Sequence, residues 1–328
     1  MKRTISVAPM MDCTDRHDRY FLRLISKNVM LYSEMVATKA AIYGDRKKIL
    51  SFSPEEKPLA LQVGGSNKKE LSEVAKIAED MGYDEININL GCPSKKVQKN
   101  KFGACLMKEP DLVSECVNEM INVCKIPVTA KTRIGFDDVE DYNYLNNFIL
   151  KIKEAGCKTF IIHARKAILT GMSPKQNLNI PKLNYKMVYM IKKENPDLEI
   201  IINGGISTTE EIKQHLNLCD GVMIGRAIYQ NPYFLADIER EIFKVDNHPS
   251  REEVAEKLLE YLEKEVKLGT KVNHVMRHTV GLYHGKIGSK NWKRYLSENM
   301  MARNSDFQKA KHIMSIVQNN EKANELNQ

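Results

Sequence analysis

Cys92 stands out among the side chains that could do chemistry. It lies in the segment NLGCPS, directly after a short apolar run and before a proline that fixes the turn. A thiol with an ordinary pKa of about 8.5 is protonated at neutral pH and can donate a proton, for which a serine hydroxyl is far too weak an acid. A hydrolytic nucleophile is the weaker interpretation, because no Cys-His-Asn set with protease spacing accompanies Cys92.

The other cysteines predict neither a metal site nor a disulfide framework. The chain has seven cysteines, an odd number, and no C-x-x-C pair, whereas zinc sites and disulfide scaffolds use paired cysteines. Cys105, in FGACLM, is interpreted as a packing residue rather than a second functional thiol. We interpret Cys116, Cys124, Cys157 and Cys219 as small buried residues.

Two glycine-containing turns predict a phosphate site. Gly204 and Gly205 in NGGI, and Gly225 in IGRA, would expose backbone N–H groups, and Arg226 would add a positive charge. The alternative is that the glycines only permit two tight turns with positive φ, which explains either motif alone better than it explains the pair. The pattern is typical of a bound nucleotide or cofactor phosphate.

Lys131 and Arg133 predict a second positive feature. They are two residues apart in one apolar run, so in a strand both side chains lie on the same face. The alternative is an internal salt-bridge network.

Alternating short apolar runs and amphipathic runs indicate the elements that would position these residues. Strands linked by helices of this length pair in parallel, and eight such units fit a (β/α)8 TIM barrel. A doubly wound open sheet is less favoured, because it usually has fewer strands and often a G-x-G-x-x-G fingerprint, which is absent. The predicted strands are Ile5–Pro9, Met30–Met35, Leu59–Val63, Glu85–Asn89, Val128–Arg133, Thr159–His163, Glu199–Asn203 and Gly221–Ile224. The predicted helices are Asp15–Ser26, Lys69–Met81, Pro110–Val123, Val139–Ala155, Tyr185–Lys193, Thr209–Leu216 and Pro232–Phe243.

Polar residues cluster at the ends of these strands. Active sites of (β/α)8 barrels lie at the carboxyl ends of the strands, so several polar strand ends indicate a shared site there. The polar residues are Glu34, Gln62, Asn87, Asn89, Lys131, Arg133, His163, Arg165, Asn203 and Arg226, and Met10 and Met11 follow the first strand.

The chain is predicted to have two domains, 1–245 and 246–328, joined by the linker Asp246–Ser250. The second shows no strand pattern and begins with an amphipathic helix over Arg251–Lys267. The segment from Lys271 to His312 contains nine basic residues and two acidic ones. The basic residues are Lys271, Arg277, Lys286, Lys290, Lys293, Arg294, Arg303, Lys309 and Lys311.

This basic helical domain suggests contact with nucleic acid. Nine cations interleaved with Tyr283, Trp292 and Tyr295 suit a structured RNA. The alternative is a solvated surface, and for the three aromatic residues alone a role in the domain's own core is the better interpretation.

Composition predicts a folded, soluble protein. The chain has 328 residues, of which 42% are hydrophobic and 28% charged, with a formal net charge of +8. No apolar run reaches the roughly 18 residues of a membrane span, and the start MKRTISVAPMMD has no signal-peptide core. We therefore expect a cytoplasmic protein without a membrane segment.

A series of segments, in this order along the chain, closely resembles the tRNA-dihydrouridine synthases, in particular their bacterial A-type branch. They are APMMDCTDRHDRYFLRLIS, LYSEMV, LQVGGS, DEININLGCPS, FGACLM, KTRIG, HARKA, INGGI and DGVMIGRA. The resemblance continues through MRHTVGLYHGKIGSKNWKRYLSEN, so it extends into the predicted second domain.

The resemblance implies an enzyme that binds flavin mononucleotide (FMN), oxidises NADPH and reduces a uridine of the tRNA D-loop, at position 20 or 20a, to 5,6-dihydrouridine. Reduction of the C5=C6 bond needs a hydride at C6, from the flavin, and a proton at C5, and Cys92 matches the family's proton donor. Lys131 would stabilise the anionic reduced flavin, and the uracil would have to be flipped out of the tRNA.

Further site residues follow from the same motifs. The implied flavin shell is Pro9, Met10, Gln62, Lys131, His163, Asn203, Gly204, Gly205, Gly225 and Arg226. Asn89 matches a residue that faces the uracil, and Arg165, Lys175 and Asn177 lie in the loop that resembles the substrate-side wall. Lys293 and Arg294 are the candidate tRNA phosphate contacts, and we expect a monomer without a metal ion.

One position departs from the family pattern. In SPKQNLNIP this chain has Leu178, where the family suggests an arginine. If that arginine contacts the uracil, another residue such as Arg165 or Lys175 substitutes for it here, or the substrate preference differs.

Two rival functions fit part of the pattern. A flavin barrel enzyme acting on a free pyrimidine, of the dihydroorotate dehydrogenase kind, needs the same phosphate loops and a similar lysine, but it has no use for the basic helical domain. An RNA-binding protein without catalysis would account for that domain, but not for Cys92, Lys131 and the phosphate loops.

Overall fold

The computed structural model describes residues 4–300, 308, 310–312, 314 and 315, and the chain divides into two compact units. The barrel unit comprises Met1–Asp12 and Val29–Gly225. The helical unit comprises Cys13–Asn28 and Arg226–Gln328. The boundary at residue 245 stays a prediction about domains, and the compact units divide the chain differently.

Parallel strands form the barrel unit. Among the described residues, eight parallel strands form a nearly closed (β/α)8 barrel in the order β1-β9-β8-β7-β6-β5-β4-β2, which confirms the predicted fold. The ring continues from β1 to β2 through Met30. Its carbonyl accepts from the N–H of Val7 at 2.9 Å, and its N–H donates to the carbonyl of Ile5 at 3.0 Å. The strands are β1 (Ile5–Val7), β2 (Leu31–Tyr32), β4 (Leu59–Gly64), β5 (Glu85–Leu90), β6 (Val128–Arg133), β7 (Thr159–His163), β8 (Glu199–Asn203) and β9 (Gly221–Ile224), with the short β3 (Val36–Ala37) beside β4.

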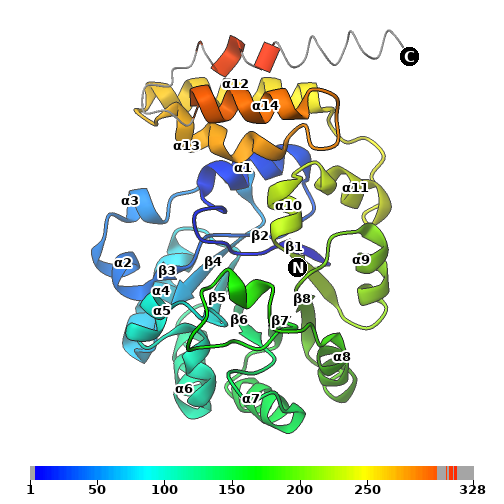
Figure 1. Cartoon of the computed structure of the whole chain (residues 1–328). Helices are drawn as coiled ribbons and strands as arrows, with labels where there is room; N and C mark the ends of the chain where they lie inside the picture. The colour runs from blue at the N-terminus through cyan, green and yellow to red at the C-terminus, as the bar shows by residue number, and fades with distance from the viewer. Residues whose placement is uncertain (1–3, 301–307, 309, 313, 316–328) are drawn as a thin grey trace. The chain divides into compact units, whose positions relative to one another are not determined.

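Helices lie around the strands of the barrel unit (Figure 1). Most begin where a side chain caps the first turn: Asn67 accepts from the backbone N–H groups of Lys69 and Glu70, and Thr208 forms a capping box with Glu211. The helices are α2 (Thr38–Tyr43), α3 (Arg46–Ile49), α4 (Lys68–Asp80), α5 (Lys95–Lys99), α6 (Pro110–Ile121), α7 (Tyr142–Glu154), α8 (Tyr185–Glu194) and α9 (Thr209–Leu216). The short 3-10 helices are η1 (Pro54–Glu56), η2 (Gly103–Lys108) and η3 (Gln176–Leu178).

Helix α7 starts three residues later than the predicted Val139. Val139 instead pairs with Phe136 in an antiparallel bridge, and Asp141 caps the helix by accepting from the N–H of Tyr144. The tight turn takes up residues that helical periodicity alone assigns to the helix.

The interior of the barrel is layered. Part of it is a buried apolar cluster: Ala8, Met30, Tyr32, Ala60, Ile161, Ile201 and Met223. Polar side chains follow toward the carboxyl ends of several strands, such as Asn89 on β5, Lys131 on β6 and Asn203 on β8. Lys131 lies opposite Asn89 in the sheet register. The strands therefore present polar chemistry at one end of the barrel, where enzymes of this fold have their sites.

The helical unit has its own aromatic core. Trp292 and Tyr283 are fully buried, their rings meet edge to face at 5.2 Å, and Trp292 Nε1 donates to the carbonyl of Thr279 at 2.8 Å. This confirms the packing interpretation for these two aromatic residues. The elements are α1 (Arg16–Ile25), α10 (Arg226–Gln230), α11 (Phe234–Glu241), α12 (Arg251–Lys267), α13 (Val272–Met276), η4 (Arg277–Gly281), α14 (Ser289–Tyr295) and the π-helical turn η5 (Leu296–Met300).

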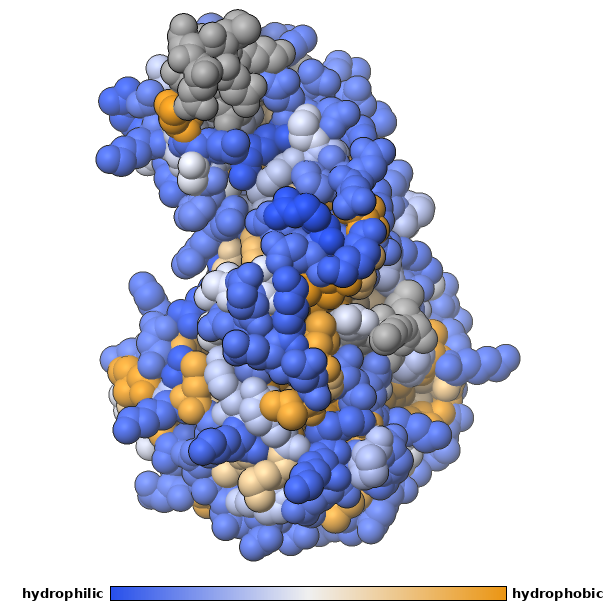
Figure 2. Space-filling view, turned by 90° about the vertical axis from the view of Figure 1, so that its right-hand side faces the viewer, coloured by the Kyte–Doolittle hydropathy of each residue, from blue (hydrophilic) through white to orange (hydrophobic). Residues whose placement is uncertain are grey.

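Hydrophilic residues dominate the face shown in Figure 2, where apolar residues form small patches. The most exposed large apolar residues are Leu268, Tyr43, Ile287 and Met11, and they are far apart in the sequence. None of the helices in the described ranges is long and apolar enough to cross a membrane.

Candidate functional site

Cys92 lies in the loop that follows β5, and its backbone is tied to the strand. The N–H groups of Gly91 and Cys92 both donate to Asn89 Oδ1, at 3.1 and 2.9 Å. Burial raises the pKa of the Cys92 thiol, and the charges of Arg133 and Lys131 oppose the rise only in part. The thiol therefore stays protonated at neutral pH, as a proton donor must.

The segment FGACLM packs against Cys92. The N–H of Ala104 donates to the carbonyl of Cys92 at 2.9 Å, and Gly103 has φ +80°, with room for no side chain beside that carbonyl. The thiol of Cys105 donates to the carbonyl of Phe102 at 3.2 Å. Cys116, Cys157 and Cys219 are buried as predicted, whereas Cys124 is only half-buried.

Lys131 is a half-buried amine whose hydrogen-bond partner is a neutral amide. Its Nζ donates to Asn203 Oδ1 at 3.1 Å, and Asn203 Nδ2 donates to the carbonyl of Met223 at 2.8 Å. Burial lowers the pKa of Lys131 to about 7, the charge of Arg133 adds to the fall, and Cys92 opposes it. An anionic or electron-rich ligand beside Lys131 would raise this pKa and favour the charged form of the amine.

Arg133, predicted as part of a second positive feature, donates hydrogen bonds to backbone carbonyls within the protein. It is buried, its Nε donates to the carbonyl of Gly91 at 2.8 Å, and one guanidinium nitrogen donates to the carbonyls of Lys166 and Asn177 at 3.1 and 3.2 Å. Arg133 thus fixes the loops after β5 and β7, because its position on the strand places it between them.

The predicted phosphate loops lie near the carboxyl ends of β7, β8 and β1. Gly204 has φ +121°, and a Cβ there would lie 2.6 Å from Cδ2 of His163, so only glycine fits. A Cβ on Gly205 would lie 2.7 Å from Cδ1 of Leu183, and one on Gly225 would lie 3.3 Å from Sδ of Met10.

The remaining predicted flavin-shell residues occupy different places. Pro9 and Met10 are half-buried two and three residues after the end of β1, and Gln62 is buried on β4. Arg226 is exposed and is the first residue of α10 in the helical unit.

The predicted substrate-side residues differ in how far the protein already uses their polar atoms. Asn177 is fully buried. Its Oδ1 accepts from the N–H of Ile168 at 2.7 Å, and its Nδ2 donates to the carbonyl of Ile168 at 2.9 Å, so Asn177 stabilises its own loop. Arg165 donates to the carbonyls of Pro181 and Asn179. Lys175 is exposed just before η3, and Leu178 ends η3 half-buried.

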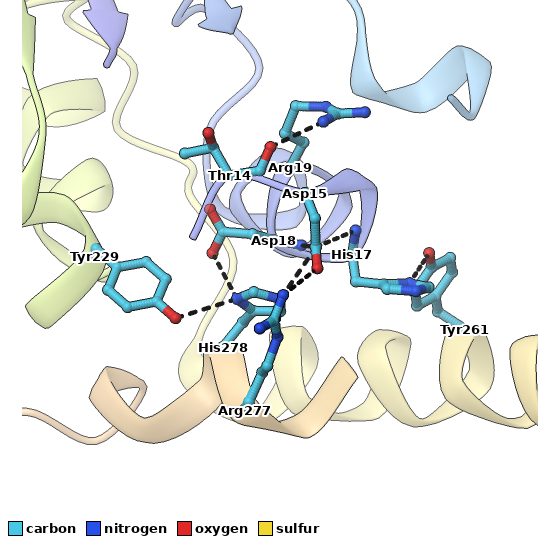
Figure 3. Close-up of polar contacts among 9 residues, drawn as sticks. All are labelled: Thr14, Asp15, His17, Asp18, Arg19, Tyr229, Tyr261, Arg277 and His278. Atoms are coloured by element: carbon cyan, nitrogen blue, oxygen red, sulfur yellow. Dashed lines mark hydrogen bonds and ion pairs between the residues drawn. The ribbon is translucent and has the colours of Figure 1, made fainter. Parts of the chain in front are cut away.

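One of the basic residues of the helical unit is committed to an internal polar cluster (Figure 3). Arg277 pairs with Asp15 at 2.6 Å, and the fully buried His278 lies 3.0 Å from Asp15 and 3.6 Å from Asp18. Burial raises the pKa of Asp15, but the hydrogen bond and charge of His278 outweigh it and hold the pKa below its ordinary value. Arg277 is therefore an internal tie between η4 and α1, which sequence reasoning missed because Asp15 is far away in the chain.

Other basic residues of this segment are exposed. Lys286, Lys290 and Lys293 line an open hollow of about 570 Å³, and Arg294 is exposed beside Tyr295. Arg303 and Lys309 lie outside the described residues. In the described ranges, no group of three or more His, Cys, Asp or Glu side chains is arranged to hold a metal ion.

The family profile described as "Dihydrouridine synthase (Dus)" matches residues 6–320 of the chain. Three curated relatives, each named tRNA-dihydrouridine(20/20a) synthase, are similar over most of their length. The protein from Synechocystis is 50% identical over 90% of this chain and 89% of its own. The Shewanella oneidensis protein is 52% identical over 91% of this chain and 89% of its own. The Escherichia coli K12 protein is 50% identical over 95% of this chain and 91% of its own.

Proposed function

The chain belongs to the dihydrouridine synthase family, and from this premise we propose that it reduces uridine at positions 20 and 20a of tRNA to 5,6-dihydrouridine, with FMN as cofactor, NADPH as reductant and Cys92 as proton donor. The tRNA substrate and its positions follow from the names of the relatives. The protein would work in the cytoplasm, where tRNA is modified.

The half-buried Lys131 is the observation that supports the flavin most directly. Burial and the charge of Arg133 lower its pKa, and the acceptor of its hydrogen bond is a neutral amide. A flavin supplies hydride transfer and carries electron-rich ring atoms that become anionic on reduction. Lys131 would hold those atoms, and Gln62, His163 and Asn203 supply further polar groups on the strands around it.

The glycine loops support the cofactor's phosphate. Gly204 and Gly205 have positive φ, and side chains at both would collide with neighbouring residues. Backbone N–H groups in such turns are suited to phosphate oxygens. Gly225 would join them from the end of β9, and Arg226, next in the chain, would contribute its charge.

Cys92 would deliver the proton to C5 of the uracil. Its raised pKa keeps the proton on sulfur until carbon accepts it, and the hydrogen bonds that Asn89 accepts from the N–H groups of Gly91 and Cys92 fix the backbone there. Asn89 would in addition face the uracil, Arg165, Lys175 and Asn177 would form the substrate-side wall, and Lys293 and Arg294 would contact the tRNA backbone.

The purified protein and its Cys92→Ala variant test this function. The wild type should show the yellow absorbance of FMN and form dihydrouridine in unmodified tRNA when NADPH is added. Cys92→Ala should retain FMN, tRNA binding and flavin reduction by NADPH, but lose nearly all dihydrouridine formation. Cys124→Ala, which removes another half-buried thiol, is the matched control and should behave as wild type. A colourless protein without affinity for FMN, or full activity in Cys92→Ala, would contradict the proposal.

A further inference from the structure

A line of buried polar side chains runs through the barrel interior and begins at Glu85, the first residue of β5. Glu85 is fully buried, and its Oε1 accepts hydrogen bonds from Tyr32 OH at 2.7 Å and from Thr129 Oγ1 at 2.5 Å. Thr129 Oγ1 in turn accepts from Asn87 Nδ2 at 2.8 Å. These groups come from β2, β5 and β6, so the line crosses between strands rather than along one.

The line continues toward the carboxyl ends of the strands and ends at the Cys92 loop. Asn87 Oδ1 accepts from Gln62 Nε2 at 2.8 Å, and Gln62 Oε1 accepts from Asn89 Nδ2 at 2.8 Å. Asn89 Oδ1 then accepts from the N–H groups of Gly91 and Cys92. We call the series Glu85–Thr129–Asn87–Gln62–Asn89 the amide ladder.

The groups at both ends of the amide ladder fix the same donor-to-acceptor direction for its hydrogen bonds. Glu85 Oε1 accepts from the hydroxyl of Thr129, which is then left to accept from the NH2 group of Asn87. The backbone N–H groups of Gly91 and Cys92 can only donate, so Asn89 must turn its oxygen toward them. Each amide between these ends has one orientation that satisfies both neighbours, and a reversed amide would leave two buried pairs unsatisfied.

We propose that Thr129 and Asn87 are positioning residues that act on Cys92 through Gln62 and Asn89. Without the hydroxyl of Thr129, the Asn87 amide loses its acceptor, and its orientation is no longer fixed from that side. A reversed Asn87 would present its NH2 group to the NH2 group of Gln62, a repulsive donor–donor contact that disturbs the hydrogen bond between Gln62 and Asn89 and so the support of the Cys92 loop. The effect on turnover rests on the proposed function of Cys92, whereas the effect on the position of the thiol does not.

Thr129→Val and Thr129→Ser form the matched pair of variants. Valine keeps the shape of threonine and removes the hydroxyl, whereas serine keeps the hydroxyl and removes the methyl group. The first measurement is the rate at which iodoacetamide alkylates Cys92 between pH 6 and 10, followed by mass spectrometry of its peptide. Alkylation of Cys124 in the same molecules reports general loosening, because Cys124 makes no bond to the amide ladder and its thiol donates to Met120 and Ile126. The second measurement is kcat and KM for unmodified tRNA.

A positioning role predicts a selective effect. In Thr129→Val, alkylation of Cys92 should rise about tenfold, and the midpoint of its pH profile should fall, since burial raises the pKa of this thiol in the wild type. The kcat should fall about 10- to 100-fold, while KM for tRNA changes much less, because a small displacement of a reacting group is that costly. Cys124 should react at its wild-type rate, and Thr129→Ser should resemble wild type in every measurement.

Other outcomes overturn the inference. Wild-type alkylation of Cys92 in Thr129→Val would show that the amide ladder does not hold the loop. Equal acceleration at Cys92 and Cys124, or equal loss in Thr129→Ser, would show general destabilisation or loss of methyl packing instead. Failure of the proposed function is a separate result: full turnover in Cys92→Ala removes the proton-donor role but leaves the alkylation comparison valid.

Discussion

Gly103→Ala tests how closely the FGACLM loop holds Cys92 in place. A Cβ at Gly103 would lie 2.6 Å from the carbonyl oxygen of Cys92 and 2.6 Å from Cγ1 of Val97. Normal contact begins well beyond 3 Å, so the Cys92 backbone or the start of η2 must shift by roughly half an ångström. Because one colliding atom belongs to the main chain, a rotamer change cannot relieve the clash.

The expected cost has two parts. Alanine at a positive φ costs about 1–2 kcal/mol relative to glycine, and forcing the extra methyl group into a packed site adds about 1–3 kcal/mol. The free energy of unfolding should therefore fall by about 2–5 kcal/mol. Turnover on saturating tRNA should fall about 10- to 100-fold through displacement of Cys92.

Gly82→Ala separates the two parts. Gly82 has φ +86°, and the nearest atom to an added Cβ is Nζ of Lys57 at 4.0 Å, so this variant carries the backbone strain without the clash. It lies before β5, at the opposite end of that strand from Cys92. Urea unfolding followed by circular dichroism, and dihydrouridine formed per enzyme, should show a loss of about 1–2 kcal/mol with near-wild-type turnover. Equal losses of stability in the two variants, or full turnover in Gly103→Ala, would refute the reasoning.

Three further variants test the helical unit and the substrate loop. Replacing Lys293 and Arg294 together by alanine should flatten the slope of log affinity for tRNA against log salt by about one to two units, with FMN content unchanged; an unchanged slope and affinity would contradict their docking role. Leu178→Arg should keep fold and flavin and maintain or improve activity, so a severe loss in a folded protein would show that the loop follows a different course. Asp15→Asn should lower the free energy of unfolding by about 1–3 kcal/mol at neutral pH by weakening the pair with Arg277. The wild-type pKa of Asp15 is depressed, so this difference should narrow as pH falls below about 4, and a difference independent of pH would argue against the ion pair.

The sequence alone determined where the eight strands of the barrel lie. Apolar runs and amphipathic spacing predicted β6, β7, β8 and β9 with the bounds that the structure has, because strand and helix periodicity is contained in short windows of sequence. The same local information singled out Cys92, because a cysteine between an apolar strand and a proline can be recognised from a short segment of sequence, without knowing which residues it contacts.

Only the tertiary structure decided which polar groups meet. Arg277 pairs with Asp15 across 262 positions, and Thr129 joins Glu85 across 44, and neither pair leaves a local pattern. Arg133 and Asn177 bond backbone groups of neighbouring loops, which are brought beside them only when distant parts of the chain fold together. Periodicity fixes which face a side chain is on, but the partner on that face depends on strands and helices brought together from distant parts of the chain.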